Sequence, residues 1–210
     1  MGTDEQLFDR DYWEDRYGAP GLAWSGSPNP VLVTEASPLE PGRALDIGSG
    51  EGGDAIWLAS RGWHVTGVDI AENALAKARG RAEAVDPAAA ARITWEQHDL
   101  TAWAPEPQSV DLVSSQFMHL PEPARSTLFQ ALAAAVAPGG TLLIVGHDVT
   151  DLAHRIHHPE LMFGADDVLA AIAGTGLRVE SAESRARQAT GPDGDPTTMH
   201  DVVVRATRPA

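Results

Sequence analysis

The fold of this chain is decided by the stretch Ala44–Asp54, which reads ALDIGSGEGGD. A short apolar run leads into closely spaced glycines, and a helical pattern follows them. A turn of this kind lets a ligand approach the backbone and directs the amide groups of a helix N-terminus toward it. We therefore predict a buried strand at residues 43–47 that delivers a ligand-binding turn.

Outward from this turn, short apolar runs alternate with helical segments. The predicted strands cover residues 43–47, 64–68, 93–97, 110–114 and 141–146, and the predicted helices cover residues 54–60, 72–84, 123–136 and 166–173. Such alternation indicates a parallel sheet with helices on both faces. No helix fits between residues 177–187 and 200–207, so we expect these two strands to pair antiparallel at one edge. The predicted fold class is α/β.

The beginning of the chain has a different character. Residues 9–17 fit a short helix, and residues 18–30 read as a loop because glycine and proline interrupt them. Residues 1–10 are polar and lack the apolar core of a signal peptide. No uncharged apolar run reaches the roughly 18 residues that a membrane helix needs. We expect a cytoplasmic protein without a membrane partner.

Charge and composition limit the classes of partner. The chain has 15 Lys and Arg against 30 Asp and Glu, which gives a formal net charge of −15. Nucleic acids and anionic lipids require a basic face, so we expect neither as a partner. The sequence contains no cysteine, which excludes disulfides, thiolate metal sites and cysteine nucleophiles.

Carboxylates in and near the turn separate two kinds of nucleoside ligand. The glycines from Gly48 onward satisfy the dinucleotide pattern G-x-G-x-x-G, and Asp69 follows Gly48 by 21 residues, where an acid accepts hydrogen bonds from a ribose diol. Asp46 and Glu51 would repel a pyrophosphate by like charge. The same carboxylates would attract a ligand that carries an ammonium and a sulfonium.

Five ordered motifs resemble those of the class I S-adenosylmethionine-dependent methyltransferases. They lie at residues 46–52, 68–70, 98–100, 111–113 and 138–142. The resemblance covers about residues 40–207 and implies a Rossmann-like, seven-stranded, mainly parallel sheet with an antiparallel edge strand. The segment Tyr12–Tyr17, with Trp24 after it, is similar to the N-terminal segment that closes over the cofactor in thiopurine- and tellurite-type small methyltransferases. By this resemblance, residues 1–41 form a cap segment and residues 42–210 the methyltransferase domain.

The resemblance implies S-adenosyl-L-methionine as the cofactor and assigns residues to its parts. The backbone of Gly48 and Gly50 would cradle the methionine end, and Asp69 would hold the ribose hydroxyls. Asp99 would accept a hydrogen bond from the adenine amino group, and Gln116 would lie near the sulfonium. The expected cofactor-binding residues are Asp46, Gly48, Ser49, Gly50, Asp69, Ile70, Asp99, Leu100, Gln116, Trp13 and Trp24.

Methyl transfer from a sulfonium is an in-line displacement, so the protein mainly positions two reactants. A general base helps only when the acceptor must lose a proton. His119 and His147 follow the fourth and fifth strands and are the candidate catalytic bases, because imidazole has an ordinary pKa of about 6.5. The stretch His154–Pro159 invites a metal site, because His154 and His158 are four residues apart, but Pro159 ends any helix there and H-E-x-x-H is absent. We therefore expect this stretch to form a mobile polar lid over the acceptor pocket. We name no metal ligand.

The predicted function is methyl transfer from S-adenosylmethionine to a small-molecule acceptor by a monomer or homodimer. Two alternatives stay open. One is an NAD(P)-dependent oxidoreductase, which the glycine pattern taken alone allows. The other is a non-catalytic nucleoside-binding protein on the same scaffold. The acceptor atom, whether O, N, S or a metalloid, is not encoded in these motifs.

Overall fold

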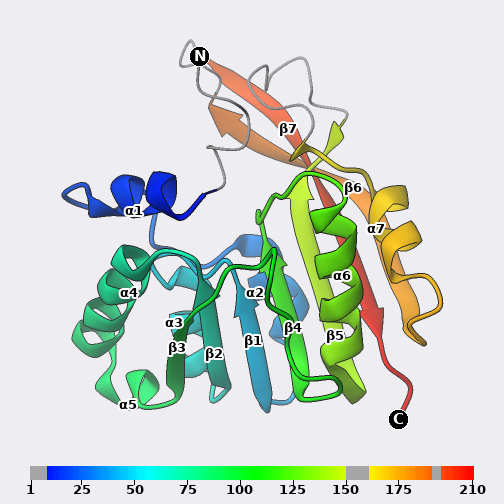
Figure 1. The fold of residues 1–210 in the computed structure, drawn as a ribbon, viewed down its shortest axis with the longest axis horizontal. Helices are drawn as coiled ribbons and strands as arrows, with labels where there is room; N and C mark the ends of the chain where they lie inside the picture. The colour runs from blue at the N-terminus through cyan, green and yellow to red at the C-terminus, as the bar shows by residue number, and fades with distance from the viewer. Residues whose placement is uncertain (1–8, 150–160, 191–194) are drawn as a thin grey trace.

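A computed structural model describes residues 9–149, 161–190 and 195–210 and shows one seven-stranded sheet in the order β3-β2-β1-β4-β5-β7-β6 (Figure 1). The strands are β1 (Arg43–Ile47), β2 (His64–Asp69), β3 (Ile93–Gln97), β4 (Val110–Gln116), β5 (Val136–His147), β6 (Arg178–Thr190) and β7 (Pro196–Thr207). The first five strands are parallel, whereas β7 runs antiparallel to both β5 and β6. The predicted sheet, with its antiparallel pair at one edge, is confirmed.

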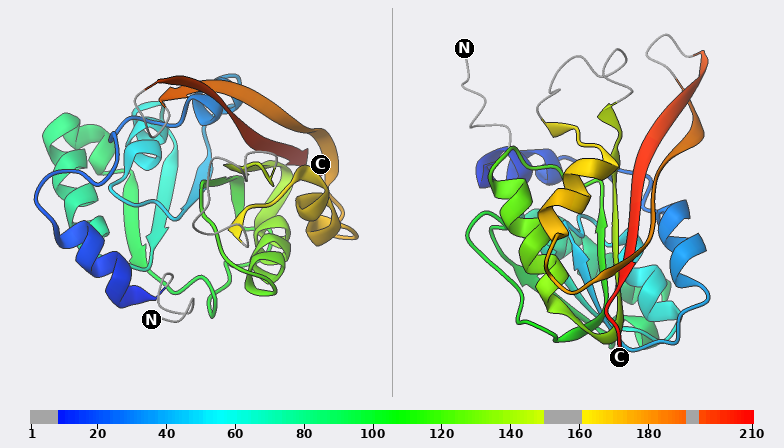
Figure 2. Two further views of the ribbon diagram at one scale, coloured as in Figure 1. Left: turned by 90° about the horizontal axis from the view of Figure 1, so that it is seen from above. Right: turned by 90° about the vertical axis from the view of Figure 1, so that its right-hand side faces the viewer.

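Helices cover both faces of this sheet, as predicted. Among the described residues they are α1 (Arg10–Gly18), α2 (Pro30–Ala36), α3 (Gly53–Ser60), α4 (Glu72–Val85), α5 (Pro87–Ala90), α6 (Ala124–Ala135) and α7 (Ala165–Ile172). Side chains alternate along a strand, so Leu45 and Ile47 pack with α6 and α7, whereas Ala44 packs with α2 and α3. The right-hand view of Figure 2 shows α6 and α7 on one side of the sheet and α2 on the other.

The centre of the sheet places several turns at one edge. β1 lies between β2 and β4, so the direction of the crossovers reverses beside it. Open α/β sheets bind ligands at the carboxyl ends of the strands beside such a reversal. Ile47 pairs with Val68 on one side and with Ser115 on the other, so the turns after β1, β2 and β4 emerge together at this edge.

The antiparallel hairpin extends past the end of its neighbour. His147 at the end of β5 pairs with Asp201 of β7, whereas β6 and β7 stay paired as far as Thr190 and Pro196. The hairpin therefore projects beyond the carboxyl ends of the parallel strands, at the same end of the molecule as α1 (Figures 1 and 2). Both strands are longer than the sequence predicts, because pairing between them continues where β5 no longer supports them.

The elements that differ from the prediction include α2 and β5. Residues 30–36 form the helix α2, although the sequence predicts no helix between the loop at residues 18–30 and the strand at residues 43–47. Asn29 caps this helix by accepting a hydrogen bond from the amide of Val31 (2.8 Å), and Pro30 occupies the first turn, where its missing N–H is harmless. β5 begins at Val136 and passes through the turn at residues 138–140, where its pairing with β4 shifts register.

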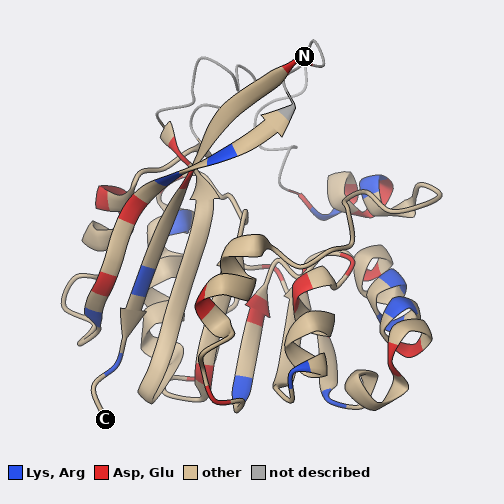
Figure 3. Ribbon diagram, turned by 180° about the vertical axis from the view of Figure 1, so that it is seen from behind, with Lys and Arg blue, Asp and Glu red and all other residues tan. Residues whose placement is uncertain are grey.

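Surface charge is mixed on the elements that the figures display. Figure 3 shows both acidic and basic residues on α4 and on the β6–β7 hairpin. Within the described ranges, no helix combines the length and the apolar character needed to cross a membrane.

Candidate functional site

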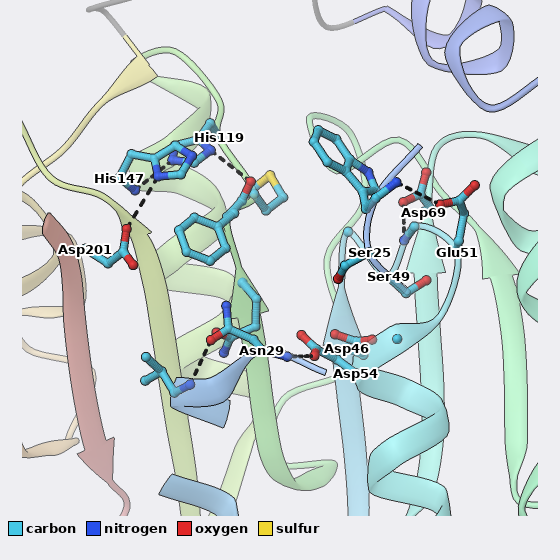
Figure 4. Close-up of a pocket in the computed structure, with 18 of the residues that line it drawn as sticks. Ser25, Asn29, Asp46, Ser49, Glu51, Asp54, Asp69, His119, His147 and Asp201 are labelled. Atoms are coloured by element: carbon cyan, nitrogen blue, oxygen red, sulfur yellow. Dashed lines mark hydrogen bonds and ion pairs between the residues drawn. The ribbon is translucent and has the colours of Figure 1, made fainter. Parts of the chain in front are cut away.

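A large pocket opens at the carboxyl ends of the parallel strands, between the N-terminal segment and the β6–β7 hairpin. Its wall includes all thirteen residues that the sequence assigns to the cofactor or to catalysis: Trp13, Trp24, Asp46, Gly48, Ser49, Gly50, Asp69, Ile70, Asp99, Leu100, Gln116, His119 and His147. Asp46 and His147, 101 positions apart in the chain, thus line one cavity, because the strands deliver their ends to one edge. Figure 4 shows two sides of this pocket, one around Asp46 and Asp69 and one around His119 and His147.

The glycine turn after β1 has a conformation that requires glycine. Gly48 and Gly50 have φ values of 68° and 51°, in the left-handed region that other L-residues rarely occupy. A β-carbon at Gly48 would lie 3.0 Å from the Met118 side chain, and one at Gly50 would lie 3.1 Å from the Tyr17 hydroxyl. The turn therefore exposes backbone to the pocket at a distance that side chains would prevent.

Asp69 ties this turn to the next βα unit. Its carboxylate accepts hydrogen bonds from the amide of Gly50 (2.8 Å) and from the amide of Ala71 (3.0 Å) at the start of α4. The side chain is buried, and burial raises its pKa even though these backbone donors oppose the effect. Asp69 lines the pocket with acceptor capacity left for a ligand hydroxyl, because a carboxylate offers about four lone-pair sites.

Two more carboxylates lie beneath the turn. Asp46 is 2% exposed, and its Oδ2 has no hydrogen-bond partner among the described residues. Burial, followed by the charges of Asp54 and Asp69, raises the pKa of Asp46 well above its ordinary value. Burial also raises the pKa of Asp54 to about 6, although the amide of Asn29 donates a hydrogen bond to it (2.6 Å). Buried carboxylates without a counter-charge favour a cationic ligand.

Glu51 serves a purpose that the sequence does not reveal. It is buried, and its carboxylate accepts hydrogen bonds from the amides of Ala23 (3.0 Å) and Trp24 (3.2 Å). Lys77 of α4 pairs with the same carboxylate (3.3 Å) and donates to the carbonyl of Gly21 (2.6 Å). Glu51 also lines the pocket, so the carboxylate that the sequence places near the ligand holds the N-terminal segment against the glycine turn as well.

Aromatic residues of that segment lie over the pocket. Trp24 donates its indole N–H to the Tyr17 hydroxyl (3.0 Å), and Trp13 stacks on Tyr17 with ring centroids 5.8 Å apart. Glu14 of α1 accepts hydrogen bonds from the amides of Glu72 and Asn73 (both 2.9 Å), which caps α4. Residues 10–24 are thus fixed to the domain at several points, and Trp24 is still 52% exposed.

The ends of β3 and β4 complete the wall. The side chain of Asp99 accepts hydrogen bonds from the amide (2.9 Å) and hydroxyl (2.7 Å) of Thr101, which orders the turn after β3. Gln116 donates to Ser114 (3.1 Å), and its Oε1 is buried without a partner in the described structure. Phe117 has a φ of 55°, a strained value for a bulky residue and a frequent mark of a functional site.

The two candidate histidines have different surroundings. His119 interacts with the backbone through both ring nitrogens: Nδ1 lies 2.8 Å from the carbonyl oxygen of Phe117, and Nε2 accepts from the amide of His147 (3.1 Å). This arrangement requires a neutral ring with the proton on Nδ1 and suits a positioning residue. The His147 ring stacks against His119, with centroids 4.9 Å apart, and its Nδ1 lies 3.6 Å from Oδ1 of Asp201.

Sequence reasoning missed two residues of this region. Asp201 of β7 and Arg187 of β6 line the pocket beside His147, and Nε of Arg187 lies 2.5 Å from Oδ2 of Asp201. Only the register of the hairpin, which sets Asp201 opposite His147, could have revealed them. The residues His154, His157 and His158 lie outside the described ranges. Among the residues that are described, no group of three metal-ligating side chains is present.

Comparison with known proteins agrees with this geometry. Residues 44–140 match a family model described as a methyltransferase domain. The chain is 33% identical over 123 residues to a trans-aconitate 2-methyltransferase of Rhizobium meliloti (strain 1021), a match that covers 57% of this chain and 44% of that relative. The chain therefore spans less than half the length of this relative.

Two solved structures share the fold. A protein from a study of the conversion of a disulfide bond into a thioacetal group during echinomycin biosynthesis has a TM-score of 0.72 and 22% identity, with 95% of this chain and 92% of that one covered. TehB from Haemophilus influenzae has a TM-score of 0.68 and 18% identity, with 95% and 66% covered. These matches make the chain similar to methyltransferases over residues 44–140, and the strand order and the solved structures show that it shares their fold.

Proposed function

We propose that this chain binds S-adenosyl-L-methionine in the pocket and transfers its methyl group to a small-molecule acceptor. The observation that carries the proposal is the pair of buried carboxylates beneath the glycine turn, Asp46 and Asp54, which we call the acidic floor. Oδ2 of Asp46 is buried without a partner among the described residues, beneath a turn held open by Gly48 and Gly50. A sulfonium and an ammonium suit this floor, whereas the phosphates of a dinucleotide would be repelled.

The residues present fit the parts of the cofactor. Asp69 has lone pairs left for the ribose hydroxyls, and Ile70 offers an apolar surface to the adenine beside Asp99 and Leu100. Oε1 of Gln116, like Oδ2 of Asp46, is a buried acceptor that a cationic methionine end would satisfy. When bound, the cofactor supplies an activated methyl group and its own leaving group.

Residues 1–41 are proposed to act as a cap over this site. Support comes from the contacts of the described part: Glu51 and Lys77 bind its backbone, and Trp13 and Trp24 line the pocket. A cap of this kind excludes water and orders the acceptor beside the methyl group. The acceptor then enters between Gln116 and the β6–β7 hairpin.

The net charge of −15 favours a small acceptor over nucleic acid, because a nucleic-acid substrate requires a basic surface. A monomer or a homodimer in the cytoplasm fits the proposal. The oxidoreductase alternative finds no support, because the family model and the relative reported above are both described as methyltransferases.

Isothermal titration calorimetry tests the proposal directly. The wild-type chain is titrated with S-adenosylmethionine, with S-adenosylhomocysteine and with NAD⁺, and Asp46→Asn is titrated as the site variant. We expect micromolar binding of both sulfur nucleosides, weaker binding to Asp46→Asn, and no heat with NAD⁺. Binding of NAD⁺ with no response to S-adenosylmethionine would overturn the proposal. Asp166→Asn is the matched control, because Asp166 is exposed on α7 and outside the pocket.

A further inference from the structure

Side chains from three strands meet on the side of the pocket away from the acidic floor. His147 ends β5, Asp201 lies opposite it on β7, and Arg187 lies on β6. Oδ1 of Asp201 is 3.6 Å from Nδ1 of His147, and its Oδ2 is 2.5 Å from Nε of Arg187. Figure 4 shows His147 and Asp201 facing one another.

Asp201 is buried at 3% exposure, which makes its hydrogen bonding informative. Arg187 occupies one carboxylate oxygen, while Oδ1 accepts no hydrogen bond from the described residues. Buried carboxylate oxygens are nearly always paired, and Nδ1 of His147, 3.6 Å away, is a donor of suitable chemistry when it carries a proton. A separation of 3.6 Å is longer than a hydrogen bond, and catalytic hydrogen bonds often shorten only when the ligands are in place.

The ring of His147 is also held in orientation. It packs against Phe117, with centroids 4.6 Å apart, and against His119, whose own nitrogens interact with the backbone. A proton on Nδ1 that points to Asp201 leaves Nε2 as the basic nitrogen of a ring that lines the pocket. An aspartate that fixes the tautomer of a histidine base is a recurrent arrangement in enzymes.

We propose that His147 is the general base of methyl transfer, with Asp201 as its positioning residue and Arg187 holding Asp201. This inference rests on the proposed function and specifies its acceptor class: a group that must lose a proton, such as a hydroxyl, a thiol or an N–H. The acceptor proton passes to Nε2 of His147 as the acceptor atom bonds to the methyl carbon. The carbon–sulfur bond breaks with its electron pair remaining on sulfur, so charge and atoms balance.

The charged and titratable groups around His147 determine how it should respond to mutation. Among the described residues they include Asp201 on β7, Arg187 on β6 behind it, His119 after β4, and Asp148 next in the chain; Arg185 of β6, which pairs in register with Asp201, also lines the pocket. The Asp201 carboxylate favours the imidazolium form, and the Arg187 guanidinium cancels part of that effect. Removing Asp201 and removing Arg187 should therefore shift the titration of His147 in opposite directions.

Long-range ¹⁵N–¹H correlation spectra test the arrangement without any acceptor. The His147 signal is assigned by its loss in His147→Gln, and the wild-type ring should carry its neutral-state proton on Nδ1. In Asp201→Asn the titration midpoint should fall by about one pH unit, and in Arg187→Gln it should rise by about half a unit. Because Arg187 is 40% exposed at its side chain, its variant is expected to fold even where Asp201→Asn does not. A proton on Nε2 in the wild type, or a midpoint unmoved in Arg187→Gln, would overturn the assignment.

Turnover tests the acceptor class. A pool of phenols, aliphatic thiols, amines, carboxylates and iodide is incubated with [methyl-³H]S-adenosylmethionine. We expect label on the proton-bearing acceptors and a methylation rate that falls toward low pH as His147 becomes protonated. In His147→Gln the rate should fall by about 100-fold or more, and this pH dependence should disappear. His64→Gln, on the amino end of β2, is the matched control. Label on carboxylate or iodide alone, or on no member, counts against the base. Calorimetric binding of S-adenosylmethionine to His147→Gln separates this failure from failure of the proposed function.

Discussion

The carboxylate of Asp69 accepts a hydrogen bond from the amide of Gly50, 19 residues earlier in the chain, at 2.8 Å. This contact joins the turn after β1 to the end of β2 and fixes the opening of the pocket. Because the same side chain also binds the amide of Ala71, one carboxylate sets both the glycine turn and the start of α4. The group proposed to hold the ribose is therefore also a structural support of the turn.

Asp69→Ala removes both functions. We expect the affinity for S-adenosylmethionine to fall by about 1–3 kcal/mol, because hydrogen bonds to the ribose are lost. The free energy of unfolding should fall as well, because two buried amides lose their acceptor. Calorimetry and urea denaturation measure the two effects. Asp166→Asn should change neither, and unchanged affinity in Asp69→Ala would show that the ribose lies elsewhere.

Gly50→Ala tests the need for glycine in the turn. The residue has a φ of 51°, and a β-carbon would lie 3.1 Å from the Tyr17 hydroxyl. A left-handed alanine costs about 1–2 kcal/mol, so we expect a loss of stability of that size together with weaker binding of the cofactor. Gly80→Ala is the control, because Gly80 lies inside α4 with nothing within 4 Å of its β-carbon position. That substitution should stabilise the chain by about 0.5–1 kcal/mol. Equal effects of the two substitutions would contradict this account of the turn.

Much of the fold could be predicted because its signals are local. The glycine turn, the parallel strands and the antiparallel pair are each encoded in short runs of sequence, and the structure confirms them. α2 was not predicted, because Asn29 and Pro30 are typical both of loops and of helix beginnings. Local sequence does not distinguish a loop from a helix here. The helix is decided by packing, because it buries Leu32 and Ala36 against the sheet.

The site was predictable where its residues belong to motifs or lie at the carboxyl end of a parallel strand, as Gln116 and His147 do. Asp201 and Arg187 are set beside His147 by hairpin register, which no local pattern encodes. The partners of Glu51 are similarly remote, since Ala23 lies 28 residues before it and Lys77 lies 26 residues after it. Its carboxylate could not be assigned to the N-terminal segment without the packing of α4 against that segment.

Glu51→Ala should release this segment. The substitution leaves the amides of Ala23 and Trp24 without an acceptor and removes the ion pair with Lys77, so we expect a loss of about 1–3 kcal/mol in stability. Limited proteolysis should then cleave the loop at residues 19–29 faster than in the wild type. Glu72→Ala removes an exposed ion pair with Arg79 and should cost less than about 1 kcal/mol. Equal protection of the loop in Glu51→Ala and wild type would show that other contacts hold it.

The acidic floor predicts how pH affects stability and binding. Burial raises the pKa of Asp54 from 3.8 to about 6, so between these values the folded chain binds more protons at this group than the unfolded chain. The contribution of Asp54 to the free energy of unfolding therefore decreases as pH rises through this window. The pKa of Asp46 is raised in the same direction, mainly by burial.

A cationic ligand favours the ionised form of both carboxylates, so its binding should release protons at low pH. We expect the affinity for S-adenosylmethionine to increase from pH 5 to pH 7, because Asp54, with a pKa of about 6, ionises within this range. Calorimetry in buffers of different ionisation enthalpy measures the proton release. Asp54→Asn should reduce the slope, whereas Asp166→Asn should retain it. Affinity that decreases over this range would mean that the floor binds a neutral or anionic group instead, because only a cation gains from the carboxylates' ionisation.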